Sequence, residues 1–242
     1  MKIMKSLLVP RRSSGWLGWR ACRAICLLVS LLVGGAALAT PSTQIWNPST
    51  DIQAKGTWHL GIDDYFSVED KGSGGQQFPT DLGLTYGVIS GVEIGADAFL
   101  PQGVAGSSLV FNAKYGIAES DIFPALAVGG YGFGLLKGAT DQNILYGVGA
   151  KTFSFGRISA GYFAGNKTTL GSDGAGVILT WDKMLTDKIW ASVDYAGGDS
   201  SLGALFAGFS YAFSANTSVL CAYGKYNNGA KPTLTTQLDI NL

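Results

Sequence analysis

The chain contains a single histidine, His59, and histidine is the side chain most often used as a general base. Asp63 lies four residues later, so in an extended strand both side chains would point to the same face. Four residues of strand span about 13 Å, which is too far for the two to touch. No serine lies close to His59 in a run that would suit a lipid hydrolase. We therefore expect no catalytic residue and keep lipid hydrolysis only as an alternative.

The acidic residues offer a second kind of chemistry, the binding of cations. Asp81, Glu93 and Asp97 fall on one face of a predicted hairpin, but no loop has the ligand spacing of a calcium site. The glycine-rich residues 72–75 resemble a phosphate loop only superficially, because no helix follows them. Once an N-terminal signal is removed, Cys221 is the only cysteine, which excludes a thiolate metal cluster. We therefore expect neither a metal nor a cofactor.

Strands must position these side chains, because apolar and polar residues alternate along most of the chain. The clearest hairpin covers residues 82–98 and turns at Ser90-Gly91. Leucine, tyrosine, valine, isoleucine and alanine occupy one parity, whereas aspartate, glutamate, glycine and threonine occupy the other. The alternation predicts about twelve strands, with a range of about 10–14. We place them at residues 56–66, 82–88, 92–98, 109–117, 122–136, 143–153, 157–164, 175–181, 188–195, 204–213, 217–226 and 232–242.

The connections between these strands alternate in length, as turns and loops do on the two sides of a transmembrane barrel. An even number of strands then places both chain ends on the side of the short turns. The short turns are predicted at residues 90–91, 119–121, 154–156, 185–187 and 214–216. The longer links are predicted at residues 71–77, 101–106, 137–142, 165–173, 197–201 and 227–231.

The last predicted strand, residues 232–242, has the strictest alternation, and its apolar face carries Leu238, Ile240 and Leu242. At this strand the chain resembles the bacterial outer-membrane β-barrels, whose final strand alternates and ends on a hydrophobic residue that the barrel-assembly machinery reads. Leu242 departs from the Phe or Trp that is usual there. The resemblance implies an all-β, transmembrane, antiparallel up-and-down barrel, closed by pairing of this strand with residues 56–66. A soluble β-sandwich or lipocalin-like barrel is the alternative, disfavoured by the long strands and the alternating loops.

Composition agrees with a membrane location, because only 14% of the residues are charged, whereas a soluble protein carries about 25%. Residues 1–39 combine basic residues, an apolar run at 24–33 and an Ala-Leu-Ala site, which predicts a secretory signal peptide. A single membrane anchor is the alternative. Removing the signal takes away six of the 17 basic residues and leaves 11 against 17 acidic ones, a net charge of −6. That charge disfavours nucleic acid as a partner.

Two Pro-Ser-Thr triplets mark residues 40–55, which we expect to be a turn-rich periplasmic leader outside the barrel wall. Residues 56–242 would then form the barrel. Residues 41–60 are also similar to the start of uncharacterised exported barrels from Gram-negative bacteria, a resemblance that implies location but no activity.

The side chains on the polar face of each predicted strand should face the lumen, and they carry an excess of negative charge. A barrel of about twelve strands lies between filled eight-stranded barrels and open sixteen-stranded ones. We therefore expect a narrow passive outer-membrane channel for small polar or cationic solutes, in contact with outer-membrane lipid and the assembly machinery, with its oligomeric state open. The alternatives are a closed structural or partner-scaffolding barrel, a lipid-modifying enzyme and an electron-conduit sheath. The candidate lumen-lining residues are His59, Asp63, Asp81, Glu93, Asp97, Lys114, Lys151, Arg157, Asp182, Asp194 and Asp239.

Overall fold

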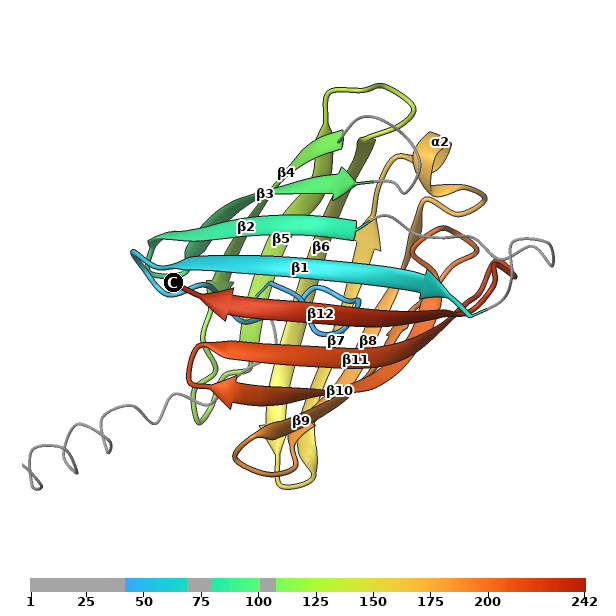
Figure 1. The fold of residues 1–242 in the computed structure, drawn as a ribbon. Coiled ribbons are helices and arrows are strands. Elements are labelled where there is room, and N and C mark those ends of the chain that lie inside the picture. The colour runs from blue at the N-terminus through green and yellow to red at the C-terminus, as the bar shows by residue number, and fades with distance from the viewer. Residues whose placement is uncertain (1–41, 69–79, 101–107) are drawn as a thin grey trace, which may run out of the picture. The chain divides into compact units, whose positions relative to one another are not determined.

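The computed structural model describes residues 42–68, 80–100 and 108–242, and they fold into a closed antiparallel β-barrel (Figure 1). Each strand pairs with its neighbours in the sequence, and the last pairs with the first. The prediction of an all-β up-and-down barrel of about twelve strands is confirmed. The strands are β1 (Trp58–Ser67), β2 (Thr80–Ile89), β3 (Val92–Leu100), β4 (Ser108–Ile117), β5 (Ala125–Gly134), β6 (Asp141–Phe153), β7 (Gly156–Ala164), β8 (Ala175–Met184), β9 (Ile189–Ala196), β10 (Ala204–Ser214), β11 (Thr217–Tyr226) and β12 (Thr233–Asn241).

The described residues contain one short helix, α2 (Lys167–Leu170), in the link between β7 and β8. In this part of the chain, no helix is both long and apolar enough to cross a membrane. The predicted signal peptide and the predicted links at 71–77 and 101–106 lie outside the described residues.

The barrel closes where it was expected to close. β12 pairs with β1 in a continuous antiparallel register, in which Leu238 faces Ile62 and Ile240 faces Leu60. The pairing extends to the final residue, because Leu242 donates its N–H to the carbonyl of Trp58 at 2.8 Å and accepts the N–H of Trp58 at 3.0 Å. Closure leaves no unpaired edge in the sheet that the described residues form.

The outer face of the wall is mainly apolar and much of the inner face is polar, which is the reverse of the arrangement in a protein that is surrounded by water. Large apolar side chains point outward, and Leu145, Phe209 and Ile94 are 62%, 54% and 50% exposed. Polar side chains such as Asp194 and Gln237 point inward and are fully buried, together with some apolar ones such as Phe206. This is the distribution found in transmembrane β-barrels.

Residues 42–54 correct one prediction, because the structure places them inside the barrel rather than outside its wall (Figure 1, blue). They form a hairpin, hereafter the lumen hairpin: Thr43 bridges Pro48, and Gln44 donates its N–H to the carbonyl of Asn47 at 2.7 Å. The physical reason is that a polar lumen of twelve strands has both the room and the acceptors for a segment rich in Ser, Thr, Asn and Gln.

The lumen hairpin returns to the wall at Gly87 on β2. Lys55 pairs with Gly87 in parallel, and the N–H of Gly56 donates to the carbonyl of Gly87 at 2.7 Å. A Cβ on Gly87 would collide with the carbonyl of Ala54. Only glycine therefore lets the returning chain lie this close to the wall.

Candidate functional site

The tip of the lumen hairpin is held by one carboxylate, Asp194 on β9. Its Oδ2 accepts the backbone N–H groups of Ile45, Trp46 and Asn47 at 2.9, 2.9 and 3.1 Å. Its Oδ1 accepts the hydroxyl of Ser192 at 2.6 Å. Three adjacent N–H groups on one oxygen form a compact anion-binding turn, so Asp194 fixes the conformation of the tip.

Aromatic packing fixes the same tip against the wall. The ring of Trp46 stacks on Phe206, with ring centroids 4.8 Å apart, and meets Tyr65 and Tyr226 edge-on at 5.7 and 6.0 Å. Its indole N–H donates to the carbonyl of Leu202 at 2.8 Å, which satisfies the polar atom of a partly buried tryptophan. The tip therefore fills the part of the lumen that β9, β10 and β11 enclose.

A second group of charges holds the arms of the lumen hairpin from β7 and β8. Arg157 pairs with Asp51 at 2.8 Å and with Asp182 at 2.9 Å. Asp182 also accepts the side-chain amide of Gln44 at 3.1 Å. The guanidinium of Arg157 thus links the second arm of the hairpin, which contains Asp51, to the wall.

A third group of charges, on β3 and β4, holds together the two ends of the hairpin. Glu93 pairs with Lys114 at 3.1 Å, and both side chains are only 2% exposed. The two carboxylate oxygens of Glu93 also accept the hydroxyl of Ser42 and the N–H of Gln53, each at 2.6 Å. Since Ser42 and Gln53 lie on opposite arms, Glu93 joins them.

His59 has acceptors beside both ring nitrogens. Its Nδ1 lies 3.1 Å from Oδ1 of Asn241, and its Nε2 lies 3.4 Å from Oδ1 of Asp239. The ring is therefore held between two side chains of β12, Asn241 and Asp239.

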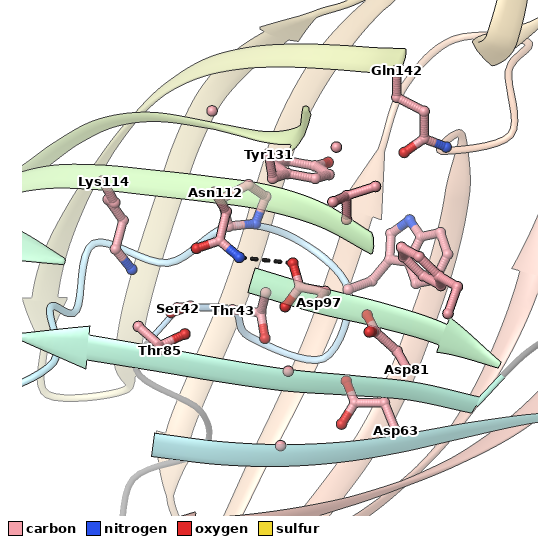
Figure 2. Close-up of a pocket in the computed structure, with 18 of the residues that line it drawn as sticks. Ser42, Thr43, Asp63, Asp81, Thr85, Asp97, Asn112, Lys114, Tyr131 and Gln142 are labelled. Carbon is pink, nitrogen blue, oxygen red and sulfur yellow. Dashed lines mark hydrogen bonds between the residues drawn. The ribbon is translucent and has the colours of Figure 1, made fainter. Parts of the chain in front are cut away.

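Between the lumen hairpin and the wall of β1 to β6 lies a cavity of about 530 Å³. Asp63, Asp81 and Asp97 come from three neighbouring strands and point into it (Figure 2). Asp97 accepts a hydrogen bond from Asn112 at 2.7 Å. Asp63 and Asp81 each have one shielded oxygen with no hydrogen-bond partner among the described residues.

The sequence-derived candidates thus separate into three groups. Glu93, Lys114, Arg157, Asp182 and Asp194 clamp the hairpin. His59 and Asp239 contact each other, whereas Asp63, Asp81 and Asp97 form an acidic face on the cavity.

Lys151 does not join these groups. On β6 the buried side chains are Ile144, Val148 and Ala150, so Lys151 lies on the outward parity. Its ammonium contacts Glu119 at 2.9 Å and the carbonyl of Ser120 at 2.9 Å, in the turn between β4 and β5. The prediction that it lines the lumen is wrong because the inward parity of β6 falls on the even-numbered positions, which places Lys151 on the outer face.

This turn supplies a pH-dependent prediction. The Lys151 ammonium and the hydroxyl and N–H of Thr152 lower the pKa of Glu119 from 4.5 to about 2. The depressed pKa gives a contribution to stability that is present above pH 4.5 and is lost as the pH falls toward 2. Lys151→Met should raise the pKa of Glu119 toward its ordinary value, as NMR titration in micelles would measure. Lys188→Met, in another turn, is the control, and an unchanged pKa in Lys151→Met would contradict the pairing.

The sequence reasoning missed the hairpin's contribution to the site, namely Trp46 and the polar side chains of Ser42, Gln44, Asn47 and Gln53. One signal was present: the two Pro-Ser-Thr triplets flank the apolar pair Ile45-Trp46 almost symmetrically. Pro and Ser favour turns, and an apolar pair between two such stretches needs a place to be buried.

No protein-family model matches the chain, and a comparison with curated proteins finds no match. Among solved structures, the chain is similar to the KdgM porin in complex with disordered oligogalacturonate, with 10% identity, a TM-score of 0.47 and coverage of 76% of this chain and 97% of that one. It is also similar to the COG4313 outer membrane channel from Pseudomonas putida F1, with 11% identity, a TM-score of 0.45 and coverage of 79% and 97%. Likeness at this level does not identify a family.

Proposed function

We propose that the protein is an outer-membrane β-barrel that admits small polar and cationic solutes to a lumen narrowed by its own N-terminal hairpin. The observation that carries this proposal is the cavity of about 530 Å³, whose acidic face opposes the lumen hairpin. Carboxylates that line a pore attract cations and repel anions.

Three features support the membrane location. The outward face carries large apolar side chains, as lipid requires. The first 39 residues are expected to direct export. The closing strand β12 alternates buried and more exposed positions, with Leu234, Leu238 and Ile240 on the less buried parity, which fits recognition by the barrel-assembly machinery. Outer-membrane lipid and that machinery are accordingly the partners that we propose.

The cavity is lined at one end by residues of the longer connections and at the other by residues near the short turns. Thr140 and Leu202 lie on the links that follow β5 and β9, whereas Glu93 and Lys114 lie near the turn that joins β2 to β3. The cavity therefore extends along a large part of the lumen. Because Glu93 and Arg157 clamp the hairpin in the lumen, we expect it to be the main obstacle for a solute.

A closed barrel without conductance is the second candidate, and the same hairpin favours it. Gln44, Ile45, Asn47 and Gln53 are each at most 4% exposed, so a well-packed segment occupies part of the lumen. In such a barrel the cavity would hold a solute without releasing it on the other side.

A planar-bilayer recording separates the two candidates. We expect the purified barrel to give discrete conductance steps with a preference for K⁺ over Cl⁻, measured as the reversal potential in a salt gradient. Asp63→Asn/Asp81→Asn should reduce that preference because it removes two of the cavity's carboxylates. Asp187→Asn, on the exposed turn before β9, is the matched control. A silent bilayer would favour the closed barrel.

A further inference from the structure

We propose that the lumen cavity is a binding site for an organic ammonium ion, a small amine that carries an aromatic or apolar portion. The inference builds on the proposed function and names the class of solute that the cavity holds.

The acidic face of the cavity is short of positive charge. Asp63 and Asp81 face each other directly in the register of β1 and β2, and Asp97 follows on β3. Like charges directly opposite each other destabilise a strand pair. Among the described residues, the salt bridges engage other acids, and Lys114, which also lines the cavity, pairs with Glu93. A cation in the cavity would remove this cost.

The two unpartnered oxygens give the ligand its polar contacts. Oδ1 of Asp63 and Oδ1 of Asp81 are shielded from solvent and accept no hydrogen bond in the described part of the chain. Buried polar atoms in proteins are normally satisfied, so these two acceptors indicate a donor that arrives from outside. An ammonium group supplies up to three N–H donors and one positive charge.

The opposite side of the cavity suits the rest of an amine. Trp46 and Tyr65 line it next to the acidic face, and their rings meet edge-on at 5.7 Å. Phe99, Tyr131 and Tyr146 line it as well. Aromatic faces attract organic cations and exclude water from their apolar parts. The site therefore combines a carboxylate face with an aromatic wall.

The size of the cavity and the glycines beside its carboxylates favour a molecule over a bare ion. A volume of about 530 Å³ lies within the range of pockets for small molecules. Gly61 and Gly83 face each other two positions along from Asp63 and Asp81, and a Cβ on Gly61 would lie 3.8 Å from both Oδ1 of Asp63 and Nε2 of His59. These positions without side chains keep the space beside the carboxylates open.

Isothermal titration of the full-length barrel in detergent micelles tests the site with three ligands of nearly equal shape. Benzylammonium carries a positive charge, benzyl alcohol is neutral and benzoate is negative. We expect benzylammonium to bind and the other two to bind at least tenfold more weakly. Asp63→Asn/Asp81→Asn should weaken benzylammonium by about tenfold or more, because it removes the buried charge partners. Asp187→Asn should leave its binding unchanged.

Two checks keep the outcome interpretable. The heat-dependent gel mobility of each variant shows whether the barrel is folded. Single substitutions, Asp63→Asn and Asp81→Asn, replace the double variant if that variant does not fold. Equal binding of benzylammonium and benzyl alcohol would overturn the proposal, and so would binding that the folded aspartate variants leave unchanged. Saturable binding of Mg²⁺ at the same aspartates with no affinity for benzylammonium would also overturn it.

The same measurements distinguish this inference from the proposed function. A barrel that binds benzylammonium through Asp63 and Asp81 but is silent in bilayers supports the site and contradicts the channel. A conducting barrel without that binding supports the channel and contradicts the site.

Discussion

Deleting residues 42–54 should raise the single-channel conductance severalfold. The lumen hairpin occupies space that the twelve strands enclose, and its removal frees that space without breaking a pair in the wall, since all the pairs that close the sheet lie within β1 to β12. Conductance of a pore grows with its open cross-section. Planar-bilayer recordings at one salt concentration, with circular dichroism to check strand content, measure the effect.

Replacement of residues 42–54 by a Gly-Ser segment of the same length is the matched control. It keeps the chain in place and removes the contacts to Asp194, Asp182 and Glu93. We expect it to behave as the deletion does, with larger current fluctuations, because a Gly-Ser segment is flexible. If both variants conduct as the natural chain does, the hairpin is not the obstacle in the pathway.

Asp194→Ala should destabilise the barrel by roughly 2–4 kcal/mol and loosen the tip of the hairpin. The substitution leaves three N–H groups without their shared acceptor, whereas the hydroxyl of Ser192 keeps the carbonyl of Trp181 at 3.1 Å, and each buried donor without a partner costs about 1–3 kcal/mol. The total is smaller than the sum because water from the cavity can reach some of these groups. Denaturant titration measures the stability.

Asp187→Ala is the control for Asp194→Ala. It removes the same atoms from the exposed turn between β8 and β9, and it should change the stability of the barrel little. Asp194→Asn keeps the shape of the side chain and one acceptor oxygen, so its stability should fall between those of Asp194→Ala and Asp187→Ala. A denaturation midpoint in Asp194→Ala that matches the natural chain would mean that the tip is held by the packing of Trp46 alone.

The wall of the barrel could be predicted from the sequence because the two faces of each strand have different surroundings and therefore carry different kinds of side chain. Alternation therefore has a period of two from β1 to β12, and a change of one residue in register would reverse it. The closing pair followed from the same reasoning, since β12 and β1 are the two strands left without a partner in a meander. Connection lengths added a second signal that does not depend on hydrophobicity.

The interior could not be predicted in the same way. Ser, Thr, Asn and Pro are suited equally to a segment in water and to one in a polar lumen, so the composition of residues 42–54 did not decide between them. Parity placed Asp63 and Asp194 on the same face, but only the folded structure shows that Asp194 binds the hairpin and that Asp63 faces the cavity. Lys151 shows that a polar side chain does not by itself mark the inward parity, because on β6 the inward positions are taken by Ile144, Val148 and Ala150.

The lumen hairpin also imposes an order on folding. It precedes every strand of the described residues, yet its partners come late: Ile45 donates its N–H to Asp194, 149 residues away, and its carbonyl accepts the side-chain amide of Gln237, 192 residues away. Contacts between such distant residues form slowly, because a long loop has to close first. The hairpin must therefore wait, without its partners, until β9 and β12 have formed. Closure of the seam between β1 and β12 is then the event that traps it, and a barrel that closes too early would leave it outside.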